Sequence, residues 1–169
     1  CYLITYDTYV DSRGYFSVPY NKEVFNSNVG YDVEFVQDNM SYSHLGTIRG
    51  LHYQSGVFAQ AKLVSCTQGR VLDVAVDIRK DSPTYGNVVK VELGWSLNNQ
   101  LFVPKGCAHG FSVLSTTAIF QYKVDNPYNK ESEGGIIYND PTLNIDWRVS
   151  DYFKRISEKD LELPTFLSL

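Results

Sequence analysis

Residues Phe35–Gln54 read FVQDNMSYSHLGTIRGLHYQ, and this stretch decides how the chain is interpreted. It places Gln37, Asn39, Arg49 and His52 among strand-forming residues. A segment that only built a hydrophobic core would not need so many hydrogen-bonding side chains at such close spacing. Arg49 and His52 together offer a fixed cation and a group that titrates near neutral pH. The pair therefore predicts an anionic substrate and proton-transfer chemistry.

Short segments with period-two alternation continue beyond this stretch, and turn sequences separate them. Many short strands at this spacing predict an all-β fold, a cupin or jelly-roll barrel with short peripheral helices. Peripheral helices are expected at Asn21–Asn28 and, as a single turn, at Asp151–Ile156. The predicted strands are Val33–Met40, Thr47–Tyr53, Ala61–Cys66, Arg70–Asp77, Val88–Leu93, Gln100–Val103, Gly110–Leu114 and Ala118–Val124.

Length and composition limit the possible classes of protein. A chain of 169 residues with 43% hydrophobic residues fits a single domain over residues 1–169 that can bury its own core. The net charge of −4 argues against a nucleic-acid partner. No apolar run is long enough to span a membrane, and no signal segment is recognised. Three cysteines without metal-binding spacing favour a reducing, cytoplasmic compartment.

The three histidines, His44, His52 and His109, do not form the H-x-H pair that a cupin metal site needs. We therefore expect neither a metal nor another cofactor. Without a metal, His52 is a candidate general base, although a lone histidine is more often structural. A base of this kind needs a carboxylate to orient its ring. The residues alone leave that carboxylate open among Asp38, Asp73, Asp77, Asp140 and Asp160.

Strand alternation indicates which side chains share a face of the barrel. Arg49 and His52 are an odd number of residues apart and diverge on a regular strand, but Gly50 between them permits a bulge. Lys62 and Tyr122 are both available to point inward. An inward Lys62 stabilises an enolate, whereas its ordinary place is a solvated face.

Two further side chains have an ordinary structural reading beside the functional one. Tyr122 is most simply a sheet tyrosine, but across a cavity from His52 it would be an acid. His109 follows the Pro104–Gly106 turn and is equally well read as a turn residue.

The segments FVQDN, GTIRGLHYQ, QAKLV, GRVLDVAVDIRKDSPTYG, VPKGCAHGFSVLS, YKVDNPY and SEKD follow one another in the chain. In this order they resemble the dTDP-4-dehydrorhamnose 3,5-epimerase family over nearly the whole chain. The resemblance implies a metal-free homodimer that inverts C3 and C5 of a nucleotide-linked 4-keto-6-deoxyhexose. Products of such enzymes feed surface polysaccharides or antibiotic sugars.

The resemblance also implies roles for individual residues. His52 is the base, Asp160 its partner carboxylate, Tyr122 the acid, and Lys62 the group that stabilises the enolate. Binding of the nucleotide sugar falls on Arg13, Phe16, Gln37, Asn39, Arg49, His109, Tyr128, Glu133 and Lys159. Among these, Arg13 and Phe16 reach the nucleotide across the dimer, and Tyr128 stacks on the base.

The chain departs from the family pattern at three positions. Val18 replaces the glutamate of RGxFxE, Met40 replaces a histidine, and Ser65 replaces an arginine. Loss of the acidic nucleotide contact leaves a GDP-linked sugar as an alternative to the dTDP-linked one. Further alternatives are an epimerase acting at one carbon, a keto-sugar isomerase, and a non-catalytic cupin that only binds a sugar nucleotide.

Overall fold

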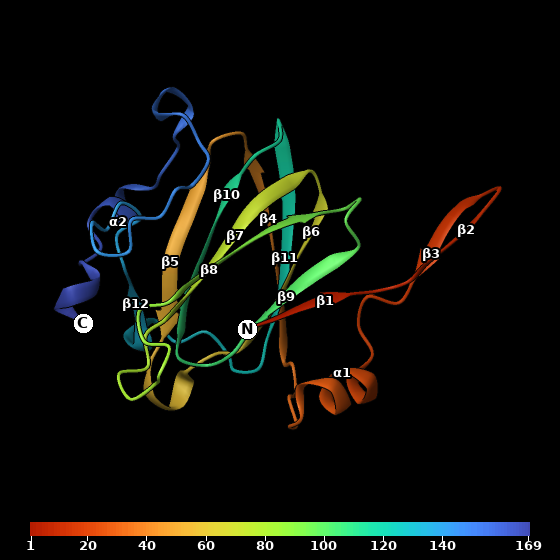
Figure 1. Ribbon diagram of the computed structural model, residues 1–169, viewed down its shortest axis with the longest axis horizontal. Helices are drawn as coiled ribbons and strands as arrows, with labels where there is room; N and C mark the ends of the chain where they lie inside the picture. Colours follow the sequence, from red (N-terminus) through yellow and green to blue (C-terminus); the bar gives the residue numbers. More distant parts are fainter.

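Two antiparallel five-stranded sheets face one another in the computed structural model, which describes residues 1–169 (Figure 1). The strand order is β1-β9-β6-β11-β4 in the first sheet and β12-β5-β10-β7-β8 in the second. A separate two-stranded hairpin, β2-β3, projects from the side of the body (Figure 1). This arrangement confirms the all-β jelly-roll prediction.

The first sheet contains β1 (Tyr2–Thr5), β9 (Asn99–Val103), β6 (Lys62–Gln68), β11 (Thr117–Val124) and β4 (Gln37–His44). The second contains β12 (Glu133–Gly135), β5 (Ile48–Gln54), β10 (Cys107–Val113), β7 (Arg70–Asp77) and β8 (Val88–Gly94), and the hairpin is β2 (Thr8–Asp11) with β3 (Gly14–Ser17). The helices are α1 (Lys22–Val29) and α2 (Glu158–Leu161), with 3-10 turns η1 (Gly56–Phe58), η2 (Lys130–Ser132), η3 (Asp151–Phe153) and η4 (Phe166–Ser168). No helix has the length and apolarity needed to cross a membrane.

Several of the predicted elements differ in extent; the strand predicted at Gly110–Leu114 runs from Cys107 to Val113, and the one predicted at Ala61–Cys66 runs from Lys62 to Gln68. The strand predicted at Val33–Met40 begins only at Gln37 and continues to His44, because the whole of β4 pairs with β11. Val33 is instead buried in the hydrophobic cluster beneath α1. The predicted helical turn at Asp151–Ile156 is shorter, a 3-10 turn that ends at Phe153.

Strand β7 shows how the sequence builds both sides of the second sheet. Its run RVLDVAVD is buried throughout except at Arg70. Val71 and Ala75 face the core between the sheets, whereas Leu72, Val74 and Val76 face the outer side of the sheet. A strand buried on both faces reads as a continuous apolar run, so the charged Asp73 in its middle is unusual.

The outer face of the second sheet is covered by the C-terminal segment of the chain, from Ile136 onwards (Figure 1). Ile136, Leu143, Trp147 and Phe166 pack there against the apolar side chains of β5, β7 and β10. The buried carboxylate of Asp140 fixes this segment by accepting hydrogen bonds from the backbone of Thr142, Leu143 and Phe166. This packing brings α2 beside β5.

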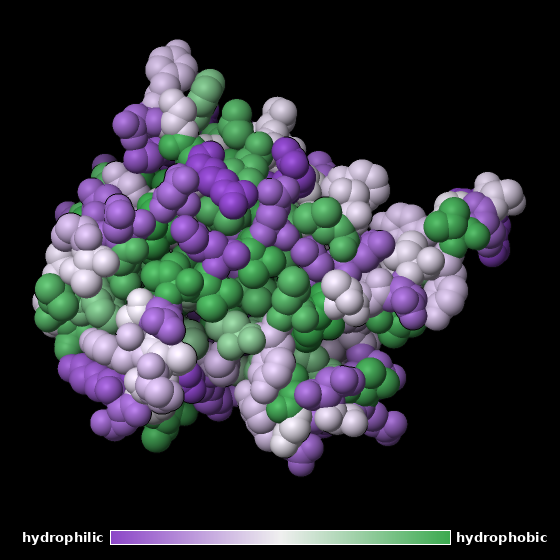
Figure 2. Space-filling model, in the orientation of Figure 1, coloured by the Kyte–Doolittle hydropathy of each residue, from purple (hydrophilic) through white to green (hydrophobic).

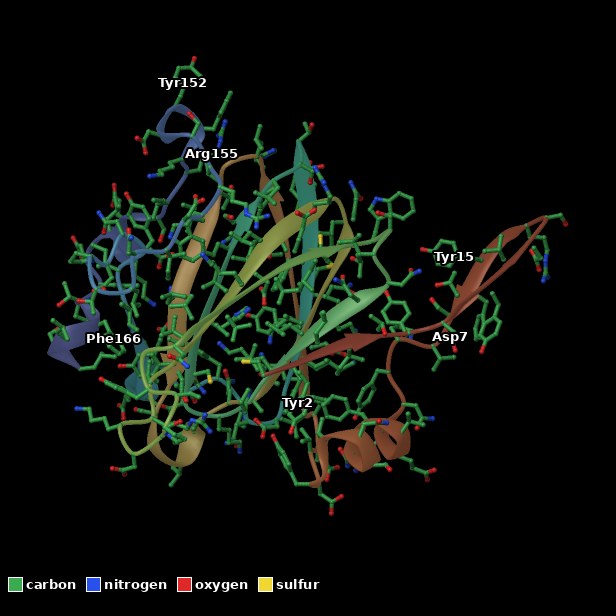
Figure 3. All side chains as sticks on the ribbon, in the orientation of Figure 1. Tyr2, Asp7, Tyr15, Tyr152, Arg155 and Phe166 are labelled. Carbon is green, nitrogen blue, oxygen red and sulfur yellow. The ribbon has the colours of Figure 1, made fainter.

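The projecting hairpin carries several exposed hydrophobic side chains, and the space-filling view shows them mixed with hydrophilic ones towards its tip (Figure 2). Tyr9, Val10, Tyr15 and Phe16 are all exposed there. Tyr15 lies on the side of the hairpin that faces the body (Figure 3), and it borders a cavity that Asn39 and Leu63 of the first sheet also line. An isolated two-stranded hairpin is marginally stable in water, and this one forms hydrogen-bonded strand pairs only within itself.

Candidate active site

A cavity of about 380 Å³ opens between the two sheets. Strands β4, β6 and β11 supply one wall, and β5, β10, β12 and α2 supply the other. Its lining combines charged and aromatic side chains: Met40, Ser41, Arg49, His52, Tyr53, Gln54, Gln60, Lys62, His109, Gly110, Phe111, Phe120, Tyr122, Tyr128, Glu133, Ser157, Lys159 and Asp160. Nine of the residues predicted as catalytic or binding groups, Asp160 among them, are therefore brought together in this cavity.

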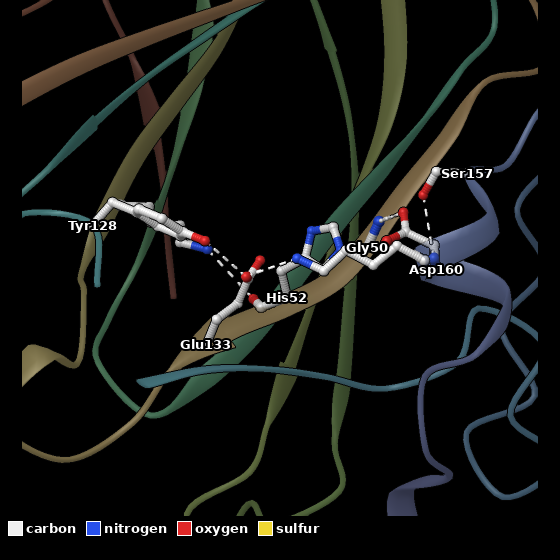
Figure 4. A network of polar contacts seen from close by, with 8 residues as sticks. Gly50, His52, Tyr128, Glu133, Ser157 and Asp160 are labelled. Carbon is white, nitrogen blue, oxygen red and sulfur yellow. Dashed lines mark hydrogen bonds and ion pairs between the residues drawn. The ribbon is translucent and has the colours of Figure 1, made fainter. Parts of the chain in front are cut away.

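His52 and Asp160, which both line this cavity, form a hydrogen-bonded pair (Figure 4). Nε2 of His52 lies 2.7 Å from Oδ1 of Asp160. The carboxylate is 6% exposed and the imidazole 33% exposed. Since an ionised carboxylate only accepts, Nε2 carries the hydrogen in the neutral ring and Nδ1 keeps the free lone pair. The pair has the form of a base with its orienting group.

Several groups hold the Asp160 carboxylate in its ionised form. Burial raises its pKa, but the hydrogen bond and charge of His52, with a hydrogen bond from the Gly50 backbone N–H, outweigh that effect and lower the pKa overall. Ser157 caps α2 by accepting the backbone N–H of Asp160 at 3.2 Å. The S-x-x-D spacing is a helix N-terminus signature through which sequence reasoning could have found Ser157.

Arg49 and His52 line the same cavity because β5 contains the predicted bulge. Opposite strand β10, three residue steps from Arg49 to His52 match only two from Phe111 to His109. Gly50 has φ of 111°, and a Cβ there would lie 2.6 Å from the carbonyl oxygen of His109. Only glycine fits this conformation and this close approach. The Nε of Arg49 donates to Ser43 at 3.1 Å.

Lys62 and Tyr122 both point into the cavity from the first sheet. Lys62 is buried rather than on a solvated face, and its Nζ donates to the His52 carbonyl oxygen at 3.4 Å. Burial lowers the pKa of Lys62 to about 8, against the opposing effect of the charges of Asp73, Cys107 and Glu133. Burial raises the pKa of Tyr122, which the charge of Arg49 offsets in part. Its phenol is therefore a protonated, potential acid.

His109 is a strand residue and not a turn residue. It lies in β10, directly opposite His52 of β5, and it is 7% exposed. Its Nε2 lies 2.8 Å from Oδ1 of Asp73. Asp73, one of the candidate partners for His52, thus contacts His109 instead. In the sequence, Asp73 stands out as a charged residue within an otherwise apolar strand.

Three other polar side chains that line the cavity form a connected group (Figure 4). Glu133 accepts hydrogen bonds from the Tyr128 hydroxyl at 2.9 Å and from Lys159 Nζ at 2.7 Å. Burial raises the pKa of Glu133, but these two hydrogen bonds outweigh it and lower the pKa overall. Tyr128 stays 57% exposed, so its ring is available to a ligand.

Four residues predicted to bind the nucleotide do not line this cavity. Arg13 and Phe16 lie in the projecting hairpin, where Arg13 pairs with Asp11. Gln37 donates to Asn39 at 2.7 Å on β4, and Asn39 lines a second cavity of about 570 Å³. Their binding roles stay predictions. Nowhere do three or more His, Cys, Asp or Glu side chains gather in a group that could hold a metal ion.

Known proteins resemble this chain over almost its full length. A family model described as dTDP-4-dehydrorhamnose 3,5-epimerase matches residues 1–168. The dTDP-4-dehydrorhamnose 3,5-epimerase of Shigella flexneri is 50% identical over 157 residues, which are 93% of this chain and 86% of the relative.

Solved structures agree with this. The crystal structure of the same enzyme from Elizabethkingia anophelis has a TM-score of 0.95 and 50% identity, covering 99% of this chain and 91% of that one. The dTDP-6-deoxy-D-glucose-3,5-epimerase of Legionella pneumophila, in complex with dTDP-4-keto-L-rhamnose, has a TM-score of 0.94 and 44% identity, covering 98% and 87%.

Proposed function

The chain belongs to the dTDP-4-dehydrorhamnose 3,5-epimerase family, and from this premise we propose that His52, oriented by Asp160, removes the carbon-bound protons of the substrate. The enzyme is an isomerase that acts on a dTDP-linked 4-keto-6-deoxy sugar. The observation that supports this base is the 2.7 Å contact between His52 and Asp160 inside the cavity. A non-catalytic binding protein would not need this pair.

The 4-keto group acidifies the protons on both adjacent carbons, C3 and C5. Removal of either proton leaves an enolate, whose negative charge concentrates on the C4 oxygen. Lys62 would stabilise that oxygen, and its buried position in the cavity lining supports this role, because a buried ammonium acts strongly on charge that develops beside it. This role needs Lys62 in its protonated form.

Inversion requires that a proton return from the face opposite to the base. His52 lies on β5 of the second sheet, and Tyr122 lies on β11 of the first, so the two line the cavity from opposite walls. A sugar ring held between the walls would present one face to each. The protonated phenol of Tyr122 is thus our candidate acid.

The diphosphate and the nucleobase of the substrate are assigned to different residues of the same cavity. Arg49 offers a guanidinium fork that suits phosphate oxygens, and Ser43 holds its Nε. Tyr128, held by Glu133, which Lys159 also contacts, would stack on the nucleobase of the substrate. His109 would contact the sugar near His52.

We further propose that the enzyme is a homodimer in which the hairpin of one subunit completes the cavity of the other. The proposal is supported by the exposed side chains of Arg13 and Phe16, which lie on the hairpin away from the cavity of their own chain. Val18, the departure from the family pattern, is also exposed and lies beyond the end of β3. It would therefore act on the nucleotide only in such an assembly.

Deuterium exchange tests the reaction directly. The enzyme is incubated in heavy water with dTDP-4-keto-6-deoxyglucose, and NMR follows loss of the C3 and C5 proton signals. We expect exchange at both carbons, and His52→Ala should abolish it at both. An absence of exchange in the wild-type enzyme would refute the proposal, and exchange at one carbon only would indicate an epimerase of one position.

A thermal-shift comparison of dTDP, GDP, UDP and CDP tests the nucleotide. A ligand that binds the native state raises its apparent stability. We expect the largest shift with dTDP, and Arg49→Ala should reduce it. A larger shift with GDP would favour the GDP-linked alternative that the Val18 position raises.

A further inference from the structure

Asp73 is a buried carboxylate to which the proposed reaction assigns no role. Its side chain is fully buried on β7, on the same face of the strand as Val71 and Ala75, between the two sheets. Oδ1 contacts Nε2 of His109 at 2.8 Å, and Oδ2 has no hydrogen-bond partner. A buried charge with one oxygen unpartnered is costly unless a cation lies close by. The protein therefore keeps Asp73 against a substantial stability cost.

Lys62, on the facing sheet, is the opposite case: a buried positive charge. It is 8% exposed, forms no ion pair, and makes one weak hydrogen bond, to a carbonyl oxygen. Burial lowers its pKa to about 8, and among the groups that oppose this effect the charge of Asp73 comes first. An ammonium that must stabilise an enolate thus depends on a nearby negative charge.

The other groups around Lys62 are less able to supply that charge. Burial raises the pKa of the Cys107 thiol and of the Tyr122 phenol, so both stay neutral near pH 7. Glu133 is shared with Lys159, and Asp160 with His52. The titratable and charged side chains that face Lys62 or share its cavity are Arg49 and His52 on β5, Asp73 on β7, Cys107 and His109 on β10, Tyr122 on β11, Glu133 on β12, and Tyr53, Tyr128, Lys159 and Asp160.

Asp73 also fixes the ring of His109. The imidazole stacks on Phe120 with a centroid distance of 6.0 Å, and Phe120 stacks in turn on Phe111 at 4.1 Å. The hydrogen bond that Nε2 donates to Asp73 sets the rotation of the ring within this stack and leaves Nδ1 free. Asp73 therefore acts on two residues of the cavity, Lys62 and His109, although it does not line the cavity itself.

We propose that Asp73 is a positioning residue that keeps Lys62 protonated and holds the His109 ring in place during the epimerase reaction. The inference rests on the proposed function of the cavity and adds a residue to it. Its specific consequence concerns pH. Without the carboxylate, Lys62 loses its proton at lower pH, and the alkaline limb of the reaction moves with it.

The test compares Asp73→Asn and Asp73→Leu with the wild-type enzyme. Leu is included because an apolar residue of similar size often replaces a buried charge without unfolding the protein. Asp140→Asn is the matched control, since Asp140 is equally buried but lies in the C-terminal segment. The measurements are the pH profile of kcat/KM for deuterium exchange and the titration of the Lys62 13Cε signal, assigned by its loss in Lys62→Met.

We expect both Asp73 variants to move the alkaline limb and the Lys62 titration to lower pH by about one unit or more. Asp140→Asn should lower stability and move neither. Unchanged titration and limb in both Asp73 variants would overturn the inference, even if their activity falls. If neither variant folds, the wild-type titration decides: a midpoint near 8 supports the inference, and one of about 5–6, as for a buried lysine without a counter-charge, overturns it.

This design separates the inference from the proposed function. If the wild-type enzyme exchanges no deuterium, the reaction is refuted, but the Lys62 titration still reports on Asp73. If the wild-type enzyme exchanges deuterium and the Asp73 variants keep its pH profile and titration, only the role of Asp73 fails.

Discussion

Nε2 of His52 and Oδ1 of Asp160 lie 2.7 Å apart although 108 residues separate them in the chain. His52 is placed by β5, and Asp160 by a four-residue helix at the end of the segment that covers the second sheet. The contact therefore exists only when the C-terminal segment has packed onto β5. The hydrogen-bonded pair that makes up the proposed base is therefore complete only when the fold is complete.

Replacing Asp160 by Asn tests this contact. The amide is nearly isosteric but no longer stabilises the imidazolium that forms when His52 takes a proton. We expect kcat for deuterium exchange to fall by about 10²- to 10⁴-fold, with a smaller effect on substrate binding. Asp151→Asn is a suitable control, because Asp151 is exposed and pairs only with Lys154. An Asp160→Asn enzyme with nearly wild-type kcat would contradict the assignment.

Tyr122→Phe should separate the two halves of the reaction. The base and Lys62 remain, so a proton can still be removed and returned from the same side. Solvent deuterium is then expected to enter C3 and C5 of recovered substrate, while formation of inverted product falls by about 10²-fold or more. NMR of both sugars in one sample measures this ratio. A product ratio equal to that of the wild-type enzyme would show that another group supplies the proton.

The sequence predicted which side chains act in the cavity better than it predicted which of them contact one another. His52, Lys62 and Tyr122 lie in strands whose alternation is visible, so their common cavity was accessible to sequence reasoning. The carboxylate partner was not, because strand alternation says nothing about where a distant segment packs. Five aspartates stayed open on the residues alone, and only the family resemblance selected Asp160.

The strands that sequence reasoning missed are also explained physically. β1, β2 and β3 contain four residues each, and most of their side chains are exposed, so they lack the alternating burial that marks a strand. β12 is three residues long and contains two glycines. β1 and β12 pair with strands that are distant in the sequence, β9 and β5, whereas β2 and β3 pair only with each other, and all four carry little local signal.

Asp77 should make the protein sensitive to acid. Hydrogen bonds from Arg79, opposed in part by burial and supplemented by Ser82 and Thr84, hold its pKa well below the usual value. Because the folded pKa is the lower one, this stabilisation is present in full above the pKa of the unfolded chain, about 3.9. It is lost as the pH falls below that value.

Asp77→Asn is therefore expected to lower the free energy of unfolding at pH 7 by about 1–3 kcal/mol. The difference from the wild-type protein should narrow below about pH 4. Urea unfolding between pH 3 and pH 7 measures it (midpoints and slopes together). Asp151→Asn is the control, since an exposed ion pair contributes little at any pH. A difference that stays constant down to pH 3 would show that the ionisation of Asp77 does not stabilise the fold.

Mixing two inactive variants tests whether the hairpin completes the cavity of a partner. Arg13→Ala removes the hairpin cation and leaves His52 intact, whereas His52→Ala removes the base and leaves the hairpin intact. In a mixed dimer, the cavity with His52 receives an intact hairpin from the other subunit, so one of its two sites is complete. After unfolding and refolding together, an equimolar mixture should recover about one quarter of wild-type activity, because half of the dimers are mixed. Size-exclusion chromatography with light scattering checks the dimer, and each variant refolded alone gives the baseline. If Arg13 serves its own chain, every mixed dimer lacks a complete site and the mixture stays at that baseline.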